Sequence, residues 1–189
     1  MKLLNYKITG TSALLMHSDA TANPLNPFTK KLKEVTKKRS KTDDDHALMS
    51  EIEFEASLYH DSEIGYYIPS ANLDASFLAS AKMFKMGTLW KQAALIPNDA
   101  KFVFKHHKMS PSDLYKSGLY SDMRTVKIGT SKTIRTRPIF KEWEIEVEVM
   151  LDEAKLNESE VDQIVNNAGL YVGLCDYRPR YGRFSVEKI

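Results

Sequence analysis

The residues best suited to chemistry lie near the C-terminal end of the chain, in the stretch 168–184. Two tyrosines and three arginines lie close together there: Tyr177, Arg178, Arg180, Tyr181 and Arg183. An arginine guanidinium is a planar fork of donors that suits phosphate oxygens, and aromatic rings offer faces on which bases stack. Three glycines in the same stretch let a backbone approach a ligand closely. This combination predicts contact with a single nucleic-acid strand, and the alternative is an ordinary helix end with solvated arginines.

Two other segments add positive charge that can follow a phosphate backbone. Residues 127–137 contain Arg135 and Arg137, which have a second interpretation as ion-pair partners of the glutamates in 142–148. The run 30–41, which can equally be a solvated flap, includes three adjacent basic residues, Lys37, Lys38 and Arg39. We expect the three basic segments to converge on one groove. Binding would then be largely independent of base sequence and would weaken with added salt.

A histidine and an aspartate in one loop, His17 and Asp19, are the best candidates for catalysis. Such a pair can move a proton during phosphodiester cleavage, which is the alternative of a metal-independent or magnesium-dependent endoribonuclease. The pair is also common by chance, so we expect a protein that is not an enzyme. No Walker loop, nucleophile elbow or zinc-ligand spacing occurs, so no cofactor or metal is expected. The acids in 43–45 suit a helix N-terminus better than magnesium.

Length and composition indicate one globular domain of 189 residues. The net charge is only +2, but positive and negative residues are segregated along the chain, which can produce one basic face. No apolar run approaches the roughly 20 residues that span a bilayer, so no membrane association is expected. The single cysteine, Cys175, excludes an internal disulfide and is typical of a reducing cytoplasm.

Period-two and helical patterns predict the elements that must position these residues. The clearest strand is 142–151, where apolar side chains alternate with four glutamates. Asn157 and Glu160 predict a capping box at the start of the last helix, which Gly173 can close. The other expected elements are strands 3–16, 66–69, 100–105 and 181–189, a hairpin of 124–128 and 133–140, a helix from a cap at Asp43 to 58, and a helix from a cap at Ser70 to 85, ended by Gly87.

These elements predict an α+β protein with a ferredoxin-like, RRM-type core. The core order is β-α-β-β-α-β. We interpret the chain as a single domain, 1–189, with a long helical and basic insertion at 17–59, a second insertion at 105–124, and a β-hairpin. Sheets of this kind bind RNA in many proteins, although a fold alone does not define a function.

Three stretches resemble the RAMP superfamily, the CRISPR-associated proteins that include RNA-coating backbone subunits. Residues 67–73, Tyr-Ile-Pro-Ser-Ala-Asn-Leu, resemble the start of that family's first helix. Residues 173–184 resemble its C-terminal glycine-rich loop, and 135–140 resemble an arginine-proline strand of the backbone subunits. The long insertion after the first strand departs from the family, so RNA-guided assembly is not implied.

The whole chain is also similar to a group of small bacteriophage proteins. The shared features are the Asn-Pro-Leu-Asn-Pro loop at 23–27, the Lys-Lys-Arg run and the Arg-Pro-Arg-Tyr-Gly-Arg-Phe ending at 178–184. Both resemblances imply a protein that binds single-stranded RNA or DNA in the host bacterial cytoplasm, with homo-oligomers along the strand as one possibility. A third class, an interaction protein that counters host defence by binding an acidic protein, stays open at this point.

Overall fold

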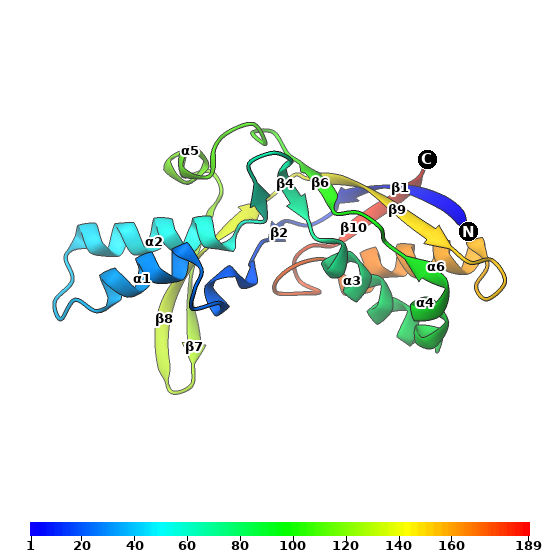
Figure 1. The fold of residues 1–189 in the computed structure, drawn as a ribbon, viewed down its shortest axis with the longest axis horizontal. Helices are drawn as coiled ribbons and strands as arrows, with labels where there is room; N and C mark the ends of the chain where they lie inside the picture. The colour runs from blue at the N-terminus through cyan, green and yellow to red at the C-terminus, as the bar shows by residue number, and fades with distance from the viewer. The chain divides into compact units, whose positions relative to one another are not determined.

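The computed structural model describes the backbone of residues 1–189 and every side chain except those of Ile128 and Ser131. The chain is an α+β protein, and its described strands pair antiparallel (Figure 1). Its internal contacts divide it into two compact units. Unit 1 consists of residues 1–15, 60–107 and 140–189, and unit 2 consists of residues 16–59 and 108–139. Residues 16–59, which cover the predicted insertion 17–59, therefore pack with a segment about 50 residues further along the chain.

Unit 1 is built on an antiparallel sheet with the order β10-β1-β9-β6-β4-β3, and β5 pairs with β9. Strands β1 and β9 at the centre pair antiparallel along the whole length of β9, with Tyr6 opposite Val147 and Ile8 opposite Ile145. The strands are β1 (Lys2–Gly10), β3 (His60–Asp61), β4 (Gly65–Ile68), β5 (Ala94–Leu95), β6 (Ala100–Val103), β9 (Glu144–Leu151) and β10 (Phe184–Lys188), with the short β2 (Leu14–Leu15) after β1.

The alternation in β9 decides which face of the sheet is buried. Ile145, Val147 and Val149 are buried, while the glutamates between them point to solvent. The strand starts at Glu144, two residues later than predicted. Helices α3 (Ser70–Met83), α4 (Gly87–Ala93) and α6 (Glu158–Asn167) lie on the buried side of the sheet (Figure 1). The apolar side chains between the sheet and these helices form the core of unit 1.

The helix ends in unit 1 confirm one predicted cap and correct two others. Asn157 and Glu160 form the predicted capping box of α6, and Gly173 ends the π-helical turn η2 (Ala168–Val172) that follows, with φ +78°. Helix α3 begins without the predicted side-chain cap from Ser70, because Pro69 occupies the cap position. Gly87 does not end α3 either, since that helix stops at Met83 and Gly87 opens α4.

Unit 2 combines helices with the predicted hairpin. Its elements are η1 (Asp19–Ala22), α1 (Pro27–Thr36), α2 (Asp43–Ser57), α5 (Pro111–Lys116), β7 (Ser121–Ile128) and β8 (Ser131–Phe140), of which the last residue is assigned to unit 1. The hairpin is confirmed, and β7 starts three residues earlier than predicted. The cap of α2 is Thr42 and not Asp43, because Thr42 and Asp45 form a reciprocal capping box. The Phe54 and Tyr115 rings pack 5.4 Å apart and join α2 to α5.

Among the residues that the structure describes, no helix combines the length and the apolar character that crossing a membrane requires.

Candidate functional site

The C-terminal loop, residues 173–183 in unit 1, is closed by backbone hydrogen bonds. The Leu174 N–H donates to the Gly182 carbonyl at 2.9 Å, so the two ends of the loop meet. The Gly182 N–H donates to the Ala13 carbonyl at 2.8 Å, and the Asp176 N–H donates to the Leu15 carbonyl at 3.0 Å. These bonds tie the loop to the segment that follows β1. The side chains on its tip are therefore presented by a fixed backbone.

The glycines of this stretch are explained by contacts inside unit 1. Gly182 has φ +72°, and an added Cβ would lie 2.1 Å from the Leu174 carbonyl oxygen. A Cβ at Gly169 would lie 2.2 Å from the Phe184 carbonyl oxygen. Only a residue without a Cβ fits such positions. The prediction that these glycines admit a ligand is replaced by a structural role, which is to let the loop pack against its own backbone.

The predicted binding side chains of the loop lie on its outside. Tyr181 is half-buried and the other four are exposed: Tyr177, Arg178, Arg180 and Arg183. The Tyr177 and Tyr181 rings meet nearly at right angles, with centroids 6.4 Å apart. The Arg183 Nε donates to the Pro179 carbonyl at 2.8 Å, so this guanidinium supports the loop. Among the described residues, neither Arg178 nor Arg180 has a carboxylate within ion-pair distance.

Helix α3 anchors the loop from inside. The buried Ser76 hydroxyl donates to the Gly173 carbonyl at 2.8 Å. Burial raises the pKa of the Cys175 thiol to about 12, although Arg178 and a hydrogen bond with Asn72 act in the opposite direction. The thiol therefore stays protonated and unreactive at neutral pH, and its role is packing.

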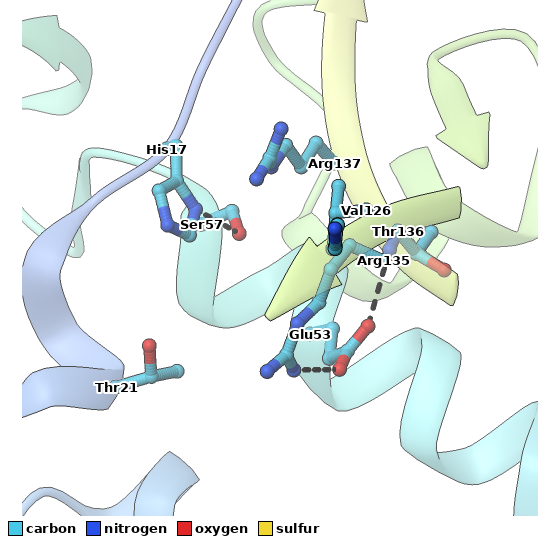
Figure 2. A pocket seen from close by; sticks show the side chains of 9 residues that line it. His17, Thr21, Glu53, Ser57, Val126, Arg135, Thr136 and Arg137 are labelled. Atoms are coloured by element: carbon cyan, nitrogen blue, oxygen red, sulfur yellow. Dashed lines mark hydrogen bonds and ion pairs between the residues drawn. The ribbon is translucent and has the colours of Figure 1, made fainter. Parts of the chain in front are cut away.

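Unit 2 contains a cavity of about 280 Å³ between helix α2, the hairpin and the segment that leads into η1 (Figure 2). Hereafter this cavity is called the unit 2 cavity. It gathers three predicted site residues, His17, Arg135 and Arg137, from segments more than 100 residues apart in the sequence. Its lining consists of His17, Thr21, Glu53, Ser57, Val126, Lys127, Arg135, Thr136 and Arg137.

One ion pair fixes a wall of the unit 2 cavity. The Arg135 Nη1 donates to the Glu53 carboxylate, whose other oxygen accepts the Thr136 N–H at 3.1 Å (Figure 2). Glu53 is buried, so its charge needs these donors. The predicted pairing of Arg135 with the glutamates of 142–148 is thus wrong, because Glu53 of α2 is its partner.

The two catalytic candidates, His17 and Asp19, have different surroundings, and only His17 lines the unit 2 cavity. His17 lines the unit 2 cavity, and its Nδ1 lies 3.3 Å from the Ser57 hydroxyl. The Ser18 N–H donates to the Ser57 carbonyl at 3.0 Å, which holds this segment against the end of α2. Asp19 is exposed in η1 and is not among the lining residues. The cavity thus offers His17 other partners than the aspartate that the sequence suggested.

The basic run Lys37-Lys38-Arg39 lies in the connection from α1 to α2 and does not line the unit 2 cavity. Lys38 donates to Asp45 at 2.6 Å, and this hydrogen bond is the largest cause of the lowered Asp45 pKa. Lys37 and Arg39 are exposed, and within the described structure they have no carboxylate partner. The interpretation of the acids in 43–45 as a helix N-terminus is confirmed by the capping box.

Charge is distributed unevenly between the units. Unit 2 has 14 lysines and arginines against 10 aspartates and glutamates, a net charge of +4. Unit 1 has 13 against 15, a net charge of −2. Sequence reasoning identified the arginines of the unit 2 cavity but missed Glu53, Ser57 and Thr21. A glutamate placed among the apolar residues of 52–56 was the sequence signal that could have found Glu53.

No group of three or more histidine, cysteine, aspartate or glutamate side chains is arranged to hold a metal ion among the described residues. Comparison with models of known protein families and with curated protein sequences found no match for this chain.

Proposed function

We propose that this protein binds single-stranded RNA or DNA, largely without regard to base sequence. The observation that carries the proposal is the C-terminal loop, which holds Arg178, Arg180 and Tyr177 exposed on a hydrogen-bonded backbone. Two guanidiniums that have no carboxylate partner in the described part of the chain can bind phosphates. A tyrosine ring beside them gives a face for one base.

The fixed backbone of the loop favours binding. A loop that is already closed by the Leu174–Gly182 hydrogen bond loses little conformational freedom when a strand docks. The net charge of +4 on unit 2 adds long-range attraction for a polyanion and speeds its encounter with the protein. Exposed Lys37 and Arg39 contribute to that charge.

The open face of the sheet in unit 1 is a poorer surface for a strand. Glu144, Glu146 and Glu148 occupy it, and Lys7 is already paired with Glu144 at 3.0 Å. These carboxylates would repel phosphate. Binding is therefore assigned to the loop, unlike the sheet-face binding that is common in RRM domains.

We propose further that unit 1 is a ferredoxin-like, RRM-type core. The strand order β10-β1-β9-β6 and the crossing helices α3 and α6 support this proposal. Unit 2 would then be assembled from the insertions of that core. Membership of a RAMP-like family of bacteriophage proteins, and a place in the host cytoplasm, belong to the same proposal and rest on the sequence resemblance.

The test is a fluorescence-anisotropy titration of the purified full chain with labelled single-stranded RNA, single-stranded DNA and duplex DNA. We expect both single strands to bind more tightly than the duplex, with affinity falling as salt is raised from about 50 to about 200 mM. An absorbance ratio that reveals copurified nucleic acid would add support. Absence of binding to any of the three at low salt would refute the proposal and favour an acidic protein partner.

One observation favours ribonuclease activity as a second candidate. His17 lies in the unit 2 cavity beside Ser57 and near Arg137, where a proton carrier and a phosphate ligand would both be present. Labelled RNA incubated with the protein, with and without magnesium, tests it. Cleavage that is lost in His17→Ala and kept in Asp19→Asn would establish this candidate, and intact RNA under all conditions would remove it.

A further inference from the structure

We infer that unit 2 binds an acidic, amphipathic helix of a partner protein in a groove between helices α1 and α2 and the β7–β8 hairpin. This helix–hairpin groove has a volume of about 700 Å³. The inference goes beyond the proposed function and does not rest on it, because the strand-binding loop belongs to unit 1. The lining residues that carry the argument are Leu32, Lys41, Met49, Met123, Lys132 and Ile134.

The periods of α2 and of the hairpin direct side chains into this groove. Positions 46, 49, 50 and 53 of α2 all line it, and this spacing of i, i+3, i+4 and i+7 is one face of a helix. On the hairpin, Met123 lies opposite Thr136, and Ile134 lies two residues before Thr136, so the three share one face of the ribbon. The Ser50 and Thr136 hydroxyl oxygens are 2.6 Å apart and join α2 to β8. The groove is therefore bounded by elements that are bonded to each other.

Large apolar side chains are exposed in the groove. Met123 is 61% exposed and Ile134 is 63% exposed, while Leu32 and Met49 contribute half-buried side chains from the two helices. Apolar groups that gather on one surface with polar residues around them mark an interaction site. Methionine adapts its shape to irregular partners. This lining suits the apolar stripe of a helix that lies in a groove.

The chemistry of the lining favours a protein over a nucleic-acid strand. Phenylalanine, tyrosine and tryptophan are absent from the described residues that line the groove, so it offers no such ring on which a base could stack. Its one arginine within the described lining, Arg135, is already paired with Glu53. A strand would thus find neither a stacking platform nor an available guanidinium, whereas aliphatic side chains of a helix would be buried.

The charge around the groove favours an acidic partner. Glu53 is the single carboxylate of the described lining, and Arg135 neutralises it. Lys41 donates to the Lys38 carbonyl at 3.1 Å, and neither Lys41 nor Lys132 has a carboxylate within ion-pair distance in the described structure. Unit 2 as a whole has a net charge of +4. Carboxylates beside the apolar stripe of a partner helix would meet these two ammonium groups and speed its encounter with unit 2.

The size of the groove is sufficient for a helix face. Its volume of about 700 Å³ lies within the range of binding sites on proteins. A cavity of roughly 150 Å³ holds one benzene-sized group. The groove therefore has room for about three or four anchoring side chains, which is the number that helices docked in grooves present at i, i+3 or i+4, and i+7.

The experiment selects partner helices without fixing their sequence beforehand. A displayed library of roughly 15-residue helix-forming peptides is selected on the purified full chain, and enriched peptides are synthesised with a fluorescent label. We expect enriched sequences to place apolar residues at i, i+3 or i+4, and i+7, with aspartate or glutamate beside them. A scrambled peptide and a peptide with lysine in place of each acid are the controls, and both should bind at least about tenfold more weakly in anisotropy titrations.

Ile134→Glu and Leu119→Glu form a matched pair of variants. Both side chains are 63% exposed in unit 2, and only Ile134 lines the groove. Ile134→Glu should weaken binding of an enriched peptide by at least about tenfold, because it removes an apolar contact and repels the acids of the peptide. Leu119→Glu should leave the affinity within about twofold of the parent.

A pair of lysines tests the charge of the groove separately. Lys127 and Lys132 face each other across the hairpin, and only Lys132 lines the groove. Lys132→Gln should weaken peptide binding by about three- to fivefold, as expected for an exposed ion pair, and Lys127→Gln should leave it within about 1.5-fold. This pair decides about the groove even where Ile134→Glu alters the hairpin.

Failure to enrich any peptide overturns the inference, as does enrichment of basic or non-amphipathic sequences. Enriched peptides that bind Ile134→Glu and Lys132→Gln as tightly as the parent also overturn it. A labelled single-stranded oligonucleotide tests the other occupant. If it displaces the peptide and binds Ile134→Glu more weakly than Leu119→Glu, the groove is a nucleic-acid site and the inference fails. If no oligonucleotide binds the protein at all, the proposed function fails, and the peptide titrations still decide about the groove.

Discussion

The Arg135 guanidinium and the Glu53 carboxylate, 82 residues apart in the sequence, form an ion pair in the wall of the unit 2 cavity. Glu53 is buried, and its second oxygen accepts the Thr136 N–H. The pair therefore joins the middle of α2 to β8. Arg135, which the sequence suggested as a nucleic-acid contact, is engaged with the protein's own carboxylate.

Glu53→Gln should destabilise the protein. The substitution removes the charge that offsets Arg135 and weakens the acceptor of the Thr136 N–H, which costs about 1–3 kcal/mol of unfolding free energy. Urea unfolding followed by circular dichroism measures the change. Glu34→Gln is the matched control, because Glu34 is exposed on α1 and should change stability by less than about 0.5 kcal/mol. Equal stability of both variants and the parent would contradict a structural role for the pair.

The double variant Arg178→Glu with Arg180→Glu should weaken single-strand binding by at least about tenfold near 100 mM salt. The slope of log affinity against log salt should become shallower by about 1.4, because each phosphate that an arginine neutralises on a single strand adds about 0.7 to that slope. Anisotropy titrations over a salt series measure both quantities.

Lys91→Glu with Lys105→Glu is the control for the loop arginines. It makes the same change of net charge at exposed positions of unit 1 outside the loop. If both double variants bind with equally reduced affinity, the effect is general electrostatics and the loop is not the binding site.

Tyr177→Ala should remove one stacking surface. Stacking of a base on an aromatic ring contributes about 1–3 kcal/mol, so affinity should fall by about fivefold or more. Because the tyrosine carries no charge, the salt slope should stay the same. Tyr177→Phe keeps the ring and should bind like the parent. A Phe variant as weak as the Ala variant would point to the hydroxyl instead of the ring.

The Cys175 thiol should resist alkylation in the folded protein. Burial raises its pKa to about 12, so the reactive thiolate is scarce near pH 8. Iodoacetamide should react at least about a hundredfold more slowly than with the urea-unfolded chain. The same measurement on the Arg178 and Arg180 double variant checks that its loop is still folded, since an opened loop would expose the thiol. Rapid reaction of the parent protein would contradict the closed loop.

The Asp45–Lys38 contact predicts a pH dependence. The pKa of Asp45 is lowered below 3.8 in the folded chain, chiefly by the hydrogen bond from Lys38 and also by the backbone of Thr42. A lowered carboxylate pKa stabilises the fold above the unfolded value, and this contribution disappears as pH falls through the folded value. The stability difference between the parent and Asp45→Asn should therefore be full at neutral pH and shrink below pH 3.8.

Thermal unfolding at a series of pH values measures this difference. Asp44→Asn is the control, because Asp44 lies in the same first turn of α2 but is exposed. The stability difference between the parent protein and Asp45→Asn could also stay constant from about pH 7 to about pH 2. That result would show that Asp45 stabilises the fold without its charge.

Local patterns in the sequence determined the elements whose signals are contained in a few neighbouring residues. The alternation of 142–151 predicted β9, and Asn157 with Glu160 predicted the start of α6, because side-chain period and capping depend on short spacings. The hairpin of β7 and β8 followed from two strand patterns around Gly129. The choice of the arginine-rich loop as a candidate site also came from residue types alone.

Tertiary structure decided everything that depends on distant partners. Only folding reveals that Arg135 meets Glu53, that His17 shares a cavity with Arg137 while Asp19 does not, and that Gly182 is required by the Leu174 backbone. These contacts join residues that sequence spacing leaves independent, because burial and loop closure select them among many chemically equivalent pairs. The sequence by itself thus identified which side chains can bind a phosphate, and the fold decided which of them are available to do so.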